Sequence, residues 1–124
     1  MIRYLCATGA VLVCVSLLAA CSPRNVSFNA DVQPILKQHC FECHVPGGAG
    51  YSASGFDMSS YGTLMKGGKF GPFVIPGDPF TSTLNMLAEG RANASIHMPR
   101  GREKLSDREI EMLKVWVQEG AKDN

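Results

Sequence analysis

Hydrophobic residues are distributed along this chain in two different ways. After a short positive start at Met1-Ile2-Arg3, they form one uncharged run from Tyr4 to Ala20. From residue 28 onward they recur at spacings of three and four, between polar and glycine-rich stretches. Such spacing places apolar side chains on one face of a helix. The pattern therefore predicts an all-α domain of short amphipathic helices behind an apolar leader.

The first of these helices is predicted between residues 28 and 39. Its helical stripe consists of Phe28, Val32, Ile35, Leu36 and His39. Asn29 or Asp31 is a suitable N-terminal cap, and Pro34 is best tolerated in a first turn. We therefore expect the regular part of this helix to start near Asp31.

Two short helices are predicted in the middle of the chain. One spans residues 61–66 and is ended by Gly67-Gly68. The other runs from a cap at Thr81 or Ser82 to Gly90, and its core face comprises Leu84, Leu87 and Ala88.

A final helix is predicted after Ser106-Asp107-Arg108-Glu109, which has the form of a capping box. It stops at Gly120, and its buried face comprises Ile110, Leu113, Trp116 and Val117. Glycine, proline and polar residues predict loops over residues 45–55, 69–79 and 92–104.

The first helix leads into Cys40-Phe41-Glu42-Cys43-His44, a C-x-x-C-H motif typical of covalent haem attachment. Thiols three positions apart lie on neighbouring faces of one helical turn, where both can add to the vinyl groups of one porphyrin. His44 then becomes an axial ligand of the iron. A disulfide, or a zinc site completed by His39 and His97, is the alternative. Zinc would call for a second ligand pair at knuckle spacing, which the sequence does not contain.

Met98-Pro99, in the loop before the last helix, is the expected source of the second axial ligand. It lies 54 positions after His44, which is enough chain to cross the haem. A thioether on a loop stiffened by proline suits an electron carrier. His97 stays open as the alternative ligand and would give a lower reduction potential. The other methionines are expected to fill the core: Met58, Met65, Met86 and Met112.

The leader has the features of an export signal. Its end, Leu18-Ala19-Ala20-Cys21, resembles the lipobox of bacterial lipoproteins, which implies cleavage before Cys21 and lipidation of that cysteine. The expected organisation is a signal peptide at 1–20, a tether at 21–27, a domain at 28–121 and a tail at 122–124. An uncleaved membrane anchor is the alternative. Ser22 replaces the aspartate that retains similar lipoproteins at the inner membrane, so the resemblance favours the outer membrane.

Cysteine and charge counts limit the remaining choices. Cys6 and Cys14 leave with the leader, so lipid and haem together use every other cysteine and no disulfide is expected. Removal of Arg3 leaves eleven basic and eleven acidic residues, a balance that does not suggest nucleic-acid binding. A small exported domain without disulfides needs another source of stability, which a buried haem can supply.

The order of helices, haem motif and methionine loop resembles the class I cytochrome c fold, and more closely the small cytochrome c-like domains of planctomycete and other bacterial proteins. The matching segments are Asp31 to Leu36, the haem motif, Gly77-Asp78-Pro79, Met98-Pro99, Leu105-Ser106 and Trp116 to Ala121. The resemblance implies N- and C-terminal helices packed around one covalent haem c with a loop-rich middle. It assigns Cys40 and Cys43 to the thioethers, and His44 and Met98 to the iron. Arg100 departs from the family, which often has a second proline there.

The expected function is electron transfer rather than catalysis. The protein would be a monohaem carrier in the periplasm, tethered by lipid to a membrane and exchanging electrons with redox partner proteins. Two alternatives remain: a five-coordinate haem catalyst or gas sensor, with polar groups supplied by His97 or Arg100, and a haem subunit of a larger respiratory complex.

Overall fold

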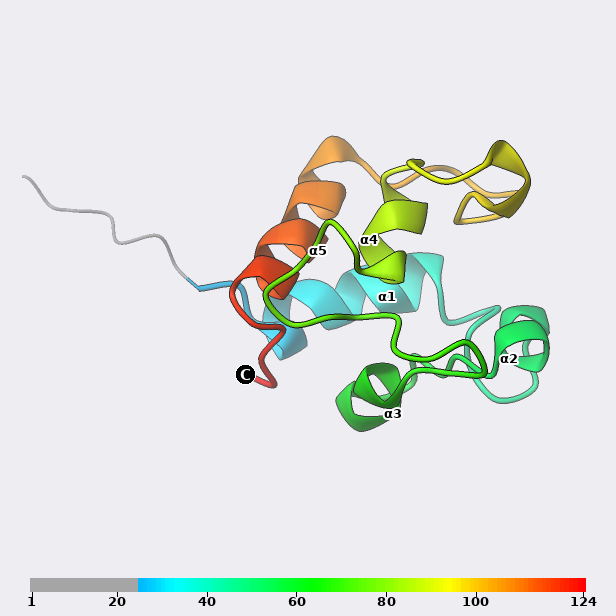
Figure 1. Cartoon of the computed structure of the whole chain (residues 1–124), viewed down its shortest axis with the longest axis horizontal. Coiled ribbons are helices and arrows are strands. Elements are labelled where there is room, and N and C mark those ends of the chain that lie inside the picture. The colour runs from blue at the N-terminus through cyan, green and yellow to red at the C-terminus, as the bar shows by residue number, and fades with distance from the viewer. Residues whose placement is uncertain (1–24) are drawn as a thin grey trace, which may run out of the picture.

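The computed structural model describes residues 25–124, so Cys21 and the predicted signal peptide lie outside the described residues. Its helices are η1 (Phe28–Val32), α1 (Gln33–His39), α2 (Ala49–Ser54), α3 (Tyr61–Lys66), α4 (Thr83–Ala88), η2 (Ala94–Ile96) and α5 (Asp107–Gln118). Over this range the only strand-like pairing is a single bridge between Gly68 and Gly71. The predicted all-α fold is confirmed (Figure 1).

The helical segment starts at Phe28, as its apolar stripe predicts, but its first residues form the wide turn η1 and the regular α-helix begins at Gln33, near the predicted start. Its cap is Ser27 rather than Asn29 or Asp31. The Ser27 hydroxyl accepts the Ala30 N–H at 3.1 Å, and the Ser27 N–H donates to the Asp31 carboxylate at 2.8 Å. This reciprocal capping closes a wide first turn, in which the Gln33 N–H donates to the Phe28 carbonyl. Both ends of that turn, Phe28 and Val32, consequently face the core.

The last residues of the chain hold this first turn in place. The Asn124 backbone oxygen accepts the Ser27 hydroxyl at 2.6 Å and the Asn29 N–H at 3.0 Å. The Asn124 side chain accepts the Phe28 N–H at 2.9 Å and donates to the Val26 carbonyl at 3.4 Å. Figure 1 shows the C-terminus beside the start of the described chain. The two ends of the domain are therefore joined by hydrogen bonds.

The capping box predicted for α5 is confirmed, and it also joins α5 to α1. The Ser106 hydroxyl accepts the Glu109 N–H at 3.3 Å, while the Glu109 carboxylate accepts the Ser106 N–H at 2.8 Å. The other Glu109 oxygen lies 3.0 Å from Nε2 of His39, at the end of α1. Hydrogen bonds from the Ser106 hydroxyl, then its N–H and then His39 lower the pKa of Glu109 below its usual value.

The middle of the chain agrees with the prediction in part. Helix α3 has the predicted bounds and ends at Gly67, and α4 covers the predicted core face. Ser82 precedes α4 without capping it, because its hydroxyl accepts the Ile75 N–H and donates to the Asp78 carbonyl, both at 2.8 Å. Part of the 92–104 loop is the short helix η2.

Helix α2 was not predicted, since residues 45–55 were expected to be a loop. The Ser52 and Ser54 hydroxyls donate to the carbonyls of Gly48 and Gly50, at 3.0 and 2.7 Å. The helix ends at Gly55, which has a φ of 68°, and the Lys69 ammonium donates to the Ser52 carbonyl at 2.7 Å. Its weak helix formers are thus stabilised by contacts with a distant part of the chain.

Within residues 25–124, no helix has the length and apolar content needed to cross a membrane. The core is built mainly from η1, α1 and α5, with Trp116, Phe28 and Leu36 among its fully buried side chains. Several core side chains also line a cavity: Phe56, Met58, Leu84 and Leu105.

Candidate cofactor site

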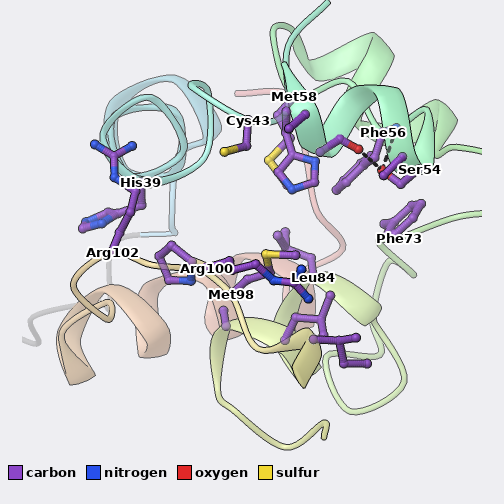
Figure 2. Close-up of a pocket in the computed structure, with 18 of the residues that line it drawn as sticks. His39, Cys43, Ser54, Phe56, Met58, Phe73, Leu84, Met98, Arg100 and Arg102 are labelled. Carbon is purple, nitrogen blue, oxygen red and sulfur yellow. Dashed lines mark hydrogen bonds between the residues drawn. The ribbon is translucent and has the colours of Figure 1, made fainter. Parts of the chain in front are cut away.

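A cavity of about 460 Å³ lies between two layers of the domain. One wall consists of the haem motif, α2 and the segment around Phe56; the other consists of α4 and the 96–105 loop. Figure 2 shows Cys43, Met58 and Phe56 on one side and Met98 and Leu84 on the other. The side chains that line the cavity are mostly apolar. The volume of the cavity is in the range of sites that bind small organic ligands.

The haem motif forms one turn at the end of α1. The His44 N–H donates to the Cys40 carbonyl at 2.9 Å, and the Cys43 N–H donates to the same oxygen at 3.1 Å. Both cysteines are free thiols, and Cys43 and His44 line the cavity. Burial, reinforced by the neighbouring Cys43 and opposed by Arg102, raises the pKa of Cys40 to about 12.

His44 is held as a neutral imidazole. Burial lowers its pKa, with a smaller opposing effect from the Phe56 backbone. Its Nδ1 is buried and has no hydrogen-bond partner among the described residues. A neutral imidazole that lines an apolar cavity is suited to binding a metal. Cys40 does not line the cavity but packs against the core one turn away. The Cys43 thiol, the imidazole and the apolar walls fit a haem attached through this motif.

Met98 and His97 are neighbours in the sequence but line different spaces. Met98 lines the cavity with His44, and its peptide bond to Pro99 is cis. His97 instead lines an adjacent cleft. Its ring packs so closely on Gly90 that a Cβ on Gly90 would lie 2.5 Å from Nε2. The structure therefore brings Met98, and not His97, to the same cavity as His44.

The other predicted candidates have different surroundings. His39 lines the cavity, but its Nε2 is 3.0 Å from the Glu109 carboxylate. Met58 is buried in the core as expected, and it also lines the cavity on the side of Cys43. Met65 and Met112 pack against the core as expected. Within residues 25–124, no three His, Cys, Asp or Glu side chains are grouped in a way that could hold a metal ion.

The sequence patterns did not identify several residues that line the cavity. The rings of Phe56 and Phe73 are stacked with centroids 4.1 Å apart, and Phe56 meets His44 edge to face at 5.8 Å. Both phenylalanines lie outside the helices, so helical periodicity gave no signal for them. Leu84 is buried in the core, as predicted, and also lines the cavity.

The charged residues of the cavity wall are basic. Arg100 and Arg102 line it, and no aspartate or glutamate between residues 25 and 124 does. The Arg102 guanidinium pairs with Glu42 at 2.6 Å, which ties the methionine loop to the haem motif. A cavity with an apolar body and cationic edges is complementary to a macrocycle that carries carboxylates.

Gly50 packs so closely against the imidazole of His44 that a side chain at this position has no room. A Cβ at this position would lie 2.7 Å from Cε1 and 2.8 Å from Nε2 of His44. Gly50→Ala must therefore displace the ring or α2, and we expect it to destabilise the domain by about 1–3 kcal/mol. Urea unfolding of the holoprotein provides the measurement.

Gly62→Ala is a matched control for this change. Gly62 is in α3, and a Cβ there would meet nothing within 4 Å. Alanine in a helix is favoured over glycine by roughly 0.5–1 kcal/mol, so Gly62→Ala is expected to stabilise the domain. Equal effects of the two substitutions would contradict the close packing of Gly50 on His44.

Comparison with known proteins agrees with this geometry. A protein-family model described as Planctomycete cytochrome C matches residues 40–100. The matched segment begins at Cys40 and includes Cys43, His44 and Met98. No curated protein and no solved structure gives a significant match to the chain.

Proposed function

The chain carries a cytochrome c domain of the planctomycete family, and from this premise we propose that it transfers single electrons through one covalent haem c. The observation that carries the proposal is the cavity that brings Cys43, His44 and Met98 together. Haem, when bound, supplies one-electron chemistry through its iron. The chain's residues attach it, bind the iron and exclude water.

Each proposed residue has a distinct part in this function. Cys40 and Cys43 hold the group through thioether bonds, and His44 presents a neutral imidazole to the iron. Met98 presents its thioether from the 96–105 loop. Two fixed protein ligands would leave no open coordination position, which favours electron transfer over catalysis. His97, one of the polar groups that a catalyst or sensor could use, lines a different cleft.

We further propose that the domain works in the periplasm, attached to a membrane by lipid at Cys21, with the outer membrane favoured. The apolar leader and its lipobox-like end support this location. In Figure 1 the described chain starts at one end of the domain, and α2 and η2 lie at the other. A tether at that start would leave the two segments beside the cavity accessible to redox partner proteins.

The test is the absorption spectrum of wild-type and Met98→Ala holoprotein in both oxidation states. Oxidised wild type is expected to show the long-wavelength methionine-to-iron band and, when reduced, to bind carbon monoxide poorly. Met98→Ala is expected to lose the band and to bind carbon monoxide readily, because it opens one coordination position. His97→Ala is the matched control and should resemble wild type.

Two results would contradict the proposal. Identical spectra of wild type and Met98→Ala would remove Met98 from the iron, and loss of the wild-type ligand set in His97→Ala would make His97 the ligand. Ready carbon monoxide binding by the wild type would instead indicate a catalyst or sensor.

A further inference from the structure

Arg100 is the cation on the cavity wall whose charge is least compensated. Arg102 is paired with Glu42, and His39 with Glu109. Arg100 donates to the neutral backbone carbonyl of Ser95, and the described residues place no carboxylate within salt-bridge distance of it. Its guanidinium therefore keeps its full positive charge beside the cavity.

The position of Arg100 brings this charge close to the proposed electron-accepting centre. It is two residues after Met98, and both side chains line the cavity. Figure 2 shows Arg100 beside Met98, on the side opposite Cys43. The other cavity residues of this wall are mostly apolar, so the field of the guanidinium is screened less on this side than in water.

We propose that Arg100 raises the reduction potential of the bound haem. This inference rests on the proposed function, since it requires haem in the cavity. Accepting one electron makes the bound group more negative by one unit, and a nearby positive charge favours that form. Arg100 is also exposed to solvent, and water reduces the effect without removing it.

The experiment compares the midpoint potentials of wild-type, Arg100→Gln and Arg100→Lys holoprotein by spectroelectrochemical titration. Arg108→Gln is the matched control, because Arg108 is an exposed residue of α5 that does not line the cavity. Arg100→Gln is expected to lower the equilibrium constant for reduction by about threefold to tenfold. A tenfold change corresponds to about 59 mV for one electron.

The control variants distinguish an effect of the Arg100 charge on the reduction potential from an effect of its packing. Arg100→Lys should keep most of the wild-type potential, and Arg108→Gln should change it little. The difference between wild type and Arg100→Gln should shrink at high ionic strength, because salt screens an exposed charge. A change in packing alone would not give this dependence.

Two outcomes would overturn the proposal. One is an Arg100→Gln potential that moves no further than that of Arg108→Gln. The other is loss of the methionine-to-iron band in Arg100→Gln, which would make Arg100 a positioning residue for the Met98 loop through Ser95. Absence of the band from the wild type would contradict the proposed ligand set instead, and the effect of the Arg100 charge would remain measurable.

Discussion

A chain with serine at both Cys40 and Cys43 is expected to carry no covalent haem and to lose most of its folded structure. The cavity of about 460 Å³ is lined mostly by apolar side chains. Without the haem, its apolar walls would face water or collapse, and the apolar burial that they provide would be lost. The total stability of a domain is only about 5–15 kcal/mol, so a loss of several kcal/mol is decisive.

Haem staining on a denaturing gel and far-ultraviolet circular dichroism measure the two parts of this prediction. The single variants Cys40→Ser and Cys43→Ser are the controls, because each keeps one thiol that can form a thioether bond. We expect both to retain haem at lower yield. A double variant that is fully helical without haem would show that the protein core of η1, α1 and α5 is sufficient for folding.

The sequence predicted most accurately those elements that depend on neighbouring residues. The Ser106 and Glu109 capping box is local, and α5 begins where it indicates. Helix α3 is likewise bounded by a serine cap and by Gly67. In both cases the hydrogen bonds that end the helix join residues only a few positions apart.

The wrong predictions concern contacts between distant residues. The cap of the first helix is Ser27, which Asn124 supports through a hydrogen bond to its hydroxyl. Helix α2 ends where Lys69 donates to its carbonyls. Nothing in the local sequence signals either partner, so Ser27 was not identified as the cap and α2 was predicted to be a loop.

In the candidate site, too, local features could be predicted from the sequence and contacts between distant residues could not. The haem motif is contiguous, and its residue types alone indicated the chemistry. The sequence favoured Met98 as the second ligand but left His97 open, because it does not show which way two adjacent side chains point. Packing of His97 on Gly90, in the adjacent cleft, distinguishes them. The stacking of Phe56 on Phe73 also could not be predicted, because it depends on a contact between two non-helical segments that are apart in the sequence.

Trp116→Ala is expected to destabilise the holoprotein by about 3–5 kcal/mol. The Trp116 side chain is fully buried, with its ring centroid 5.6 Å from that of Phe28. Its indole N–H donates to the Lys122 carbonyl at 3.0 Å, which holds the end of the chain near the first turn. Alanine would therefore leave a cavity between η1 and α5 and would also release the C-terminal contacts with η1. Urea unfolding monitored by circular dichroism gives the shift in midpoint.

Two further variants show which interactions account for the loss of stability in Trp116→Ala. Trp116→Phe keeps most of the ring but removes the donor, so it should cost less than alanine and expose the contribution of the Lys122 bond, about 1 kcal/mol. Phe80→Ala removes an aromatic ring that is 74% exposed and should change stability by less than about 1 kcal/mol. A Trp116→Ala loss no greater than that of Phe80→Ala would mean that the haem cavity, rather than the contact between the two ends of the chain, provides most of the stability. In that case the urea midpoint of unfolding should depend on haem content alone. The Cys40→Ser and Cys43→Ser variants, which are expected to hold less haem, would then show how the midpoint changes with haem content.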